Sequence, residues 1–195
     1  MDAQRILDLI VKTGALKNTP RAGWRIRGIK GGESVADHAF RMAYVAMILA
    51  DAVRESGVEL DTEKILRMAL LHDIGESEIG DIPMTAAPFV PPELKQDSES
   101  RAVAGLLSGL GSVGARYREI WEEFAAATTP EARLVRAADK LEMLVQAFEY
   151  ETTGYRSLED FWENSANRSF FDDFLVVKEI SRLLVEKRMN LRKDR

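Results

Sequence analysis

Apolar residues recur at intervals of three and four along most of the chain, which is the spacing of amphipathic helices. A first helix is predicted over residues 6–16. A second should run from Ser34, a suitable N-cap residue, to about Ser56. Its apolar residues surround nearly the whole helix, which predicts a central position. These residues are Phe40, Met42, Tyr44, Val45, Met47, Ile48 and Leu49.

A third helix and a long loop are predicted next. Asp61 or Thr62 can cap this helix, which should continue through Leu71 and is apolar enough to be central as well. Residues 80–93 hold four prolines, so they cannot form a regular helix and predict a surface loop.

The second half of the chain is also predicted to be helical. Two shorter helices are expected near residues 97–110 and 114–127. The segment Thr129-Pro130-Glu131 then opens a long helix, with threonine at the cap and proline in the first turn. The apolar stripe of this helix consists of Leu134, Ala138, Leu141, Val145 and Phe148. The last apolar stripe of the chain consists of Phe174, Val177, Ile180 and Leu184. Because no strand-like alternation and no repeat is visible, the sequence predicts one all-α domain over residues 1–195.

Composition narrows the possible partners and the compartment. The net charge is −5 with both signs interleaved, which gives no electrostatic footprint for nucleic acid or an anionic membrane. The chain has no cysteine, so disulfides and thiolate metal sites are excluded. The start lacks the pattern of a secretory signal, and the most apolar run, MAYVAMILA, is too short to span a bilayer. We therefore expect a cytoplasmic protein.

The chain has only two histidines, and each follows or precedes an aspartate, in ADH at 36–38 and HD at 72–73. His38 opens one central helix and His72 ends the other. The simpler alternative is that each is a core histidine satisfied by a hydrogen bond. An apolar residue would fill that space at lower cost, however, because a buried polar group without a partner costs roughly 1–3 kcal/mol.

Asp139 lies one position past Ala138 on the core stripe of the long helix, where aspartate is an unfavourable residue. A salt bridge to Arg136 or Lys140 is the competing explanation. If two imidazoles and two carboxylates converge from three helices, they form a site for a divalent cation. Mixed nitrogen and oxygen ligands suit Mn, Fe, Co, Ni or Zn better than Ca or Mg.

The series His38, His72-Asp73 and Asp139 on successive helices resembles the signature of the HD-domain metal-dependent phosphohydrolases. Three longer segments resemble the 5'-deoxynucleotidases of that superfamily, which remove phosphate from deoxyribonucleoside 5'-monophosphates. These segments are GWRIRGIKGGESVADH, LLHDIGESEIGDIP and VRAADKLEM. The resemblance covers roughly residues 5–185 and implies an HD-domain helical bundle that acts on a small nucleotide. GWRIRG and WEEF look closer to the archaeal and eukaryotic relatives.

The resemblance implies a role for each matching residue. The ligands of a single divalent transition metal fall on His38, His72, Asp73 and Asp139. Only one metal is implied, because HD proteins with more metals need further histidines. The metal would activate a water that attacks the phosphate.

Glu76 matches the acid–base carboxylate of the family. At four residues past His72 it should share a helical face with that histidine. A solvated glutamate at a helix end is its alternative. Asp81 matches a catalytic-site carboxylate near the sugar, with a simple loop aspartate as the alternative. Trp24 matches an aromatic residue that closes the pocket, with core packing as the alternative.

Two departures put the sugar preference in doubt. The bacterial 5'-deoxynucleotidases have an arginine directly before the tryptophan, and this chain has Gly23. Residues 124–127, Phe-Ala-Ala-Ala, offer no polar side chain where those enzymes contact the substrate. Arg25 or Arg27 can pair with phosphate oxygens, with solvent-facing arginine as an equal alternative.

Other functions stay open at this point. An HD hydrolase of deoxynucleoside triphosphates or alarmone is one alternative, although alarmone hydrolases carry an acid where this chain has Ser77. A catalytically silent nucleotide-binding HD protein is another. The resemblance also suggests a homodimer.

Overall fold

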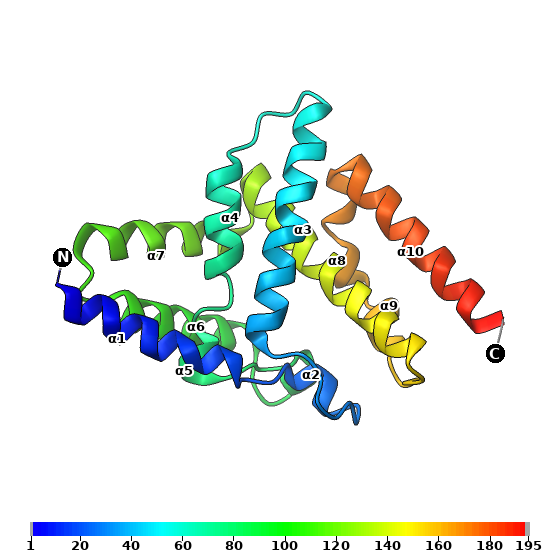
Figure 1. Ribbon diagram of the computed structural model, residues 1–195, viewed down its shortest axis with the longest axis horizontal. Coiled ribbons are helices and arrows are strands. Elements are labelled where there is room, and N and C mark those ends of the chain that lie inside the picture. Colours follow the sequence, from blue (N-terminus) through cyan, green and yellow to red (C-terminus); the bar gives the residue numbers. More distant parts are fainter. Residues whose placement is uncertain (1, 194–195) are drawn as a thin grey trace. The chain divides into compact units, whose positions relative to one another are not determined.

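The computed structural model describes residues 2–193, and all regular elements in that part of the chain are helical (Figure 1). The α-helices are α1 (Ala3–Thr13), α2 (Ala22–Arg25), α3 (Val35–Glu55), α4 (Thr62–Leu71), α5 (Glu76–Ile79), α6 (Pro92–Leu107), α7 (Gly111–Ala126), α8 (Pro130–Thr152), α9 (Glu159–Glu163) and α10 (Leu175–Lys193). Short 3-10 turns are η1 (Gly14–Lys17), η2 (Met84–Ala86), η3 (Ser165–Arg168) and η4 (Phe171–Asp173). The only extended pairing in the described residues is an isolated antiparallel bridge between Pro20 and Ser34. The predicted all-α fold is confirmed.

The described residues divide into two compact units. The first contains residues 2–40 and 67–126, and the second contains residues 41–66 and 127–193. The prediction of one domain over residues 1–195, with a core at about 5–185, stays a prediction.

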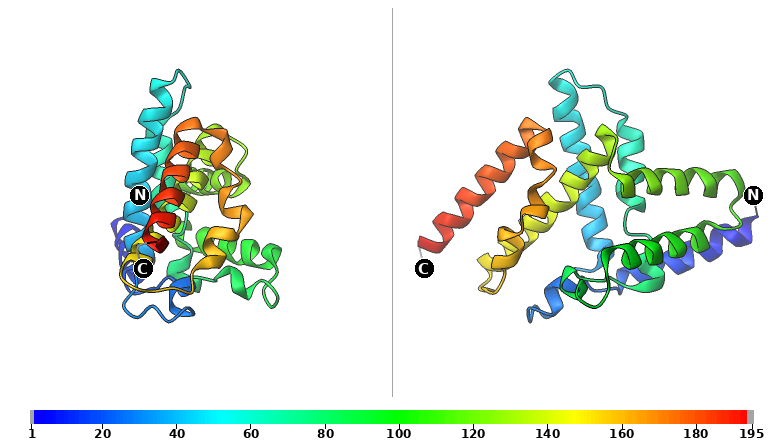
Figure 2. Two further views of the ribbon diagram at one scale, coloured as in Figure 1. Left: turned by 90° about the vertical axis from the view of Figure 1, so that its right-hand side faces the viewer. Right: turned by 180° about the vertical axis from the view of Figure 1, so that it is seen from behind.

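The first unit is built around a cluster of buried side chains from α4, α6 and α7. In Figure 2, seen from behind, α6 and α7 follow one another through a short turn, and α1 runs beside α6. The cluster consists of Leu71, Ile74, Val103, Leu106, Leu107, Leu110 and Trp121. Burial of this apolar surface fixes the position of the C-terminal end of α4. His72 and Asp73 follow directly after this end and so are placed in the site described below.

Gly114 marks a close approach between α7 and the end of α6. A Cβ atom at this position would lie 2.3 Å from the carbonyl oxygen of Leu107. We therefore expect Gly114→Ala to lower the free energy of unfolding by about 1–3 kcal/mol, because the backbone must shift. Gly105→Ala in α6 is the matched control, since its Cβ would have no neighbour within 4 Å. Equal melting temperatures for the two variants would contradict the close approach.

The second unit pairs the long helix α8 with α10. Figures 1 and 2 show these helices side by side and running in the same direction, with α9, η3 and η4 in the connection between them. Glu151 is buried at the end of α8 and accepts hydrogen bonds of 2.7 Å from both Nε and Nη2 of Arg188. The same guanidinium stacks on Trp162 at 4.4 Å from the ring centre. This bidentate contact fastens α10 to α8.

The caps predicted from the sequence are present. Ser34 and Asp37 cap α3 reciprocally, since Asp37 N–H donates to Ser34 Oγ and Ser34 N–H donates to Asp37 Oδ2. Asp61 accepts from the N–H of Lys64 at the start of α4, and Thr129 accepts from the N–H of Ala132 at the start of α8.

Two predictions about the helices are wrong. The second helix, α3, is not buried all round: Phe40, Tyr44 and Ile48 are exposed at 76%, 55% and 47%, and they form one stripe at intervals of four residues. The helix predicted from residue 97 begins earlier, because Pro92 occupies its first turn, where the missing N–H costs nothing.

Within residues 2–193, no helix has both the length and the hydrophobicity that crossing a bilayer requires.

Candidate metal centre

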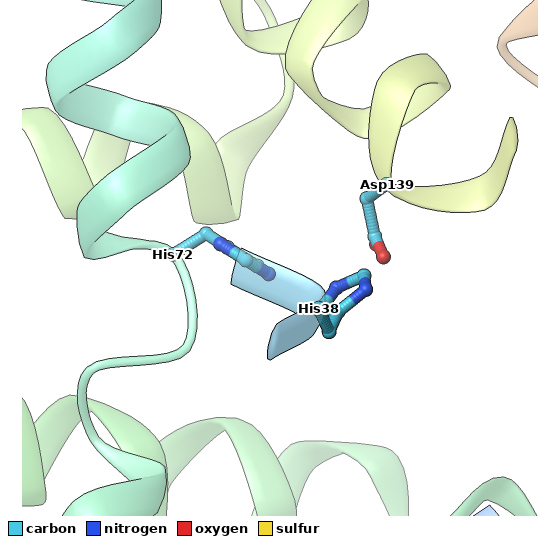
Figure 3. Close-up of side chains that lie close together, drawn as sticks. All are labelled: His38, His72 and Asp139. Atoms are coloured by element: carbon cyan, nitrogen blue, oxygen red, sulfur yellow. The ribbon is translucent and has the colours of Figure 1, made fainter. Parts of the chain in front are cut away.

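Both histidines lie in the first unit and face each other. His38 is in the first turn of α3, and His72 follows the last residue of α4. They are 0% and 5% exposed, and their ring centres are 5.3 Å apart (Figure 3). A ring nitrogen of each lies within 4.8 Å of the other, so one ion placed between them can reach both.

The backbone of α4 fixes the orientation of His72. Its Nδ1 lies 2.7 Å from the carbonyl oxygen of Ala69, and this contact favours the tautomer in which Nδ1–H donates. Phe124 packs edge-on against the ring at 5.6 Å, and Trp121 Nε1–H donates to the carbonyl oxygen of His72. The other nitrogen, Nε2, is buried and lies 3.0 Å from Oδ2 of Asp73. In the tautomer with Nδ1–H, Nε2 carries the lone pair that a metal ion needs.

Asp73 places a carboxylate next to both imidazoles. Its Oδ2 lies 3.0 Å from Nε2 of His72, 3.9 Å from Nε2 of His38 and 3.1 Å from Nη1 of Arg21. Burial alone would raise the pKa of Asp73, but the positive charge that His72, Arg21 and His38 can carry outweighs it and holds the pKa well below its usual range. Asp73 is therefore a carboxylate, the form that ligates a metal, at neutral pH.

Glu76 lies in the same unit as His72, but the two residues do not share a helix. The expectation of one shared helical face is wrong, because α4 ends at Leu71 and Glu76 begins the short helix α5 after a turn. Its alternative as a solvated glutamate also fails, since the residue is 5% exposed and its Oε2 is buried without a hydrogen-bond partner. Burial, together with the charges of Asp73 and Asp81, raises the pKa of Glu76 to about 10. The group is thus able to hold a proton at neutral pH.

Asp139, also labelled in Figure 3, lies in the second unit on α8 and is 6% exposed. The salt bridge considered as its alternative role is present, since Lys140 Nζ lies 3.0 Å from Asp139 Oδ2. A buried aspartate with an adjacent ammonium is consistent with either role.

The residues predicted to bind substrate have different surroundings. Trp24 is 2% exposed and donates from Nε1 to Glu33 at 2.8 Å, so its packing matches the core alternative. Arg25 is exposed, and Nη1 of Arg27 donates to the carbonyl oxygen of Gly23. Asp81 accepts from the N–H of Ala22 at 2.6 Å and so joins the loop after α5 to the start of α2. Their roles toward substrate stay predictions.

Sequence reasoning missed two residues near this site. Arg21 contacts Asp73, and Glu33 has a carboxylate oxygen within 4.8 Å of a ring nitrogen of His38. Arg21 is as far from Trp24 in the sequence as Arg27, and no local pattern distinguishes it. The spacing of Glu33, five residues before His38, carries no helical periodicity that would have marked it.

Comparison with known proteins places this arrangement in a family. The family model described as the HD domain matches residues 13–173, which is most of the chain. This chain belongs to the HD-domain family. It is 33% identical to the human 5'-deoxynucleotidase HDDC2, over 97% of this chain and 89% of that protein, and 39% identical to the 5'-deoxynucleotidase HDDC2 of Dictyostelium discoideum, over 82% of each. A conserved hypothetical protein from Pyrococcus furiosus has the same fold, with a TM-score of 0.76 and 39% identity over 90% of this chain and 99% of that one. The resemblance to HD phosphohydrolases seen in the sequence is confirmed.

The donor set of this HD domain fits a transition metal. The first unit alone supplies two buried imidazoles and an ionised carboxylate, a combination that favours such ions over Ca or Mg. His72 also has the carbonyl contact on its second nitrogen that orients metal-ligating histidines.

Proposed function

We propose that this HD-domain protein removes the 5'-phosphate from deoxyribonucleoside or ribonucleoside monophosphates by attack of water. The observation that carries the proposal is the grouping of His38, His72 and Asp73 beside the buried Glu76 within one compact unit. The relatives named 5'-deoxynucleotidase support the choice of substrate class. Asp139 is proposed as the fourth ligand because VRAADKLEM matches the family motif.

Such a site would hold one divalent transition metal, Mn, Co, Fe, Ni or Zn. When bound, the metal supplies a Lewis acid that lowers the pKa of water and neutralises phosphate charge. The residues of the chain do the rest. His38, His72 and the carboxylates would hold the metal ion in position. Glu76 takes a proton from the attacking water or gives one to the departing 5'-oxygen. Its raised pKa suits the acid half of this exchange, because the protonated group can give its proton to the departing 5'-oxygen.

The closed surroundings of the site also contribute. Phe124 and Trp121 cover His72 and exclude water from that side, which strengthens the electrostatic interactions between Asp73 and its neighbours. Asp81 is proposed to sit near the sugar, where its contact with Ala22 would hold the loop in place.

A cytoplasmic location and a homodimer complete the proposal.

The test is a product assay on protein purified with Mn or Co. We expect inorganic phosphate to be released from a panel of nucleoside 5'-monophosphates, and chelation with EDTA to remove the activity until metal is restored. Elemental analysis should find one transition metal per chain. Pyrophosphate or tripolyphosphate as the product would instead favour an HD hydrolase of alarmone or triphosphates. Metal and nucleotide binding without turnover would favour a silent nucleotide-binding protein.

A further inference from the structure

Arg21 is the arginine that contacts the metal-binding carboxylate. Its Nη1 lies 3.1 Å from Oδ2 of Asp73, and the two side chains are 15% and 20% exposed. The contact joins residues 52 positions apart in the sequence and lies wholly within the first unit. It places a guanidinium, the side chain best shaped for phosphate oxygens, at the edge of the candidate metal centre.

The backbone that carries Arg21 is anchored on two sides. The N–H of Arg21 donates to the carbonyl oxygen of Glu33, next to the bridge between Pro20 and Ser34. The following N–H, that of Ala22, donates to Asp81 at 2.6 Å. Because the Cα position is held by these contacts, less conformational entropy is lost when the side chain binds a ligand.

The charge of Arg21 reaches both carboxyl groups that the reaction requires. Burial, Asp73 and Asp81 raise the pKa of Glu76, while Arg21 and Lys95 act in the opposite direction. Arg21 also pairs directly with the carboxylate of Asp73, 3.1 Å away. A phosphate held between the metal ligands and Glu76 would therefore lie within the field of this guanidinium.

The two arginines favoured by the sequence are placed differently. Arg25 is exposed, and Nη1 of Arg27 donates to the carbonyl oxygen of Gly23 in its own turn. Arg21, by contrast, contacts Asp73 directly.

We propose that Arg21 binds the substrate phosphate, a role for which Arg25 and Arg27 were the candidates in the sequence. The inference rests on the proposed function, because it places a phosphate beside Asp73 and Glu76. Asp73 would share its negative charge between a bound divalent cation and Arg21. The N–H donors of the guanidinium would then be available to phosphate oxygens, which they can bind in pairs.

The experiment measures phosphate binding separately from turnover. Manganese-loaded wild type, Arg21→Gln and Arg21→Lys are titrated with inorganic phosphate by calorimetry, and KM is determined for a nucleoside 5'-monophosphate. We expect Arg21→Gln to weaken phosphate binding and raise KM by about 10- to 100-fold, the loss of one or two charge-assisted hydrogen bonds. Arg21→Lys should recover part of this, because it restores the charge but not the fork. Metal content should stay at the wild-type level.

Four outcomes separate the possibilities. Arg101→Gln, an exposed arginine paired with Asp97 on α6, is the matched control and should bind phosphate like wild type. If Arg21→Gln loses metal as well as phosphate binding, Arg21 positions Asp73 and the inference is overturned. The same follows if Arg25→Gln or Arg27→Gln abolishes phosphate binding while Arg21→Gln does not. If wild type binds phosphate through Arg21 but releases none from any monophosphate, the inference stands and the proposed function fails.

Discussion

Replacing Asp73 by alanine should abolish both metal binding and phosphate release. Oδ2 of Asp73 is within 4 Å of a nitrogen of each histidine, so the substitution removes a carboxylate that both imidazoles contact. The loss of metal affinity should exceed the roughly 10- to 100-fold effect of changing a residue that merely supports a ligand. Elemental analysis after gel filtration and a phosphate-release assay measure the two effects on the same sample.

The matched control is Asp97→Ala, since Asp97 is an exposed carboxylate of the first unit that pairs with Arg101. This variant should keep the metal and the activity. Circular dichroism and the melting temperature establish that Asp73→Ala is folded, and zinc or manganese titration by calorimetry measures what affinity is left. If the Asp73 variant hydrolyses substrate as well as wild type, the metal centre has been assigned to the wrong residues.

The helices could be predicted because their signals are local. Ser34, Asp61 and Thr129 cap helices in the structure as their sequence contexts indicate, and a cap depends only on the next three residues. The exposed stripe of Phe40, Tyr44 and Ile48 could not be predicted, because hydrophobic periodicity identifies a helix but not which elements cover it. Large exposed apolar residues contradict no rule of folding, since much of any protein surface is apolar.

The two histidines of the candidate site could also be singled out from the sequence, for a different reason. Burying a histidine among apolar residues costs free energy unless its ring nitrogens bind a ligand or form hydrogen bonds. His38 and His72 therefore stood out from their surroundings. Arg21 did not stand out, because an arginine in a Gly-rich connector is ordinary and its contact with Asp73 spans 52 residues. Glu76 was singled out by an expected helical face that does not exist, since helix α4 ends before it, and its acid–base role stays a prediction.

Replacing Glu76 by glutamine should leave the metal in place and lower the turnover number by about 100- to 10,000-fold. Glutamine has nearly the same shape but cannot take up or release the proton that the reaction requires. Glu78→Gln is the control, because Glu78 is exposed and pairs with Lys12 at 3.0 Å. Steady-state kinetics and elemental analysis give the comparison. Loss of metal in the Glu76 variant would make the residue a ligand rather than an acid–base group.

The same variant has a second readout that needs no substrate. Because the pKa of Glu76 rises from 4.5 to about 10 on folding, the folded state holds this proton more tightly than the unfolded chain does. The stability that follows is complete below pH 4.5 and is lost as the pH rises toward about 10. Glutamine cannot ionise, so it avoids this loss. The melting temperature of the metal-free wild type should therefore fall more steeply than that of Glu76→Gln between about pH 6 and pH 9, a range in which ordinary carboxyl groups no longer titrate. If the melting temperatures of wild type and Glu76→Gln change in parallel with pH across that range, the pKa of Glu76 is not raised by folding. The proposed role of Glu76 as a proton carrier would then lose its basis.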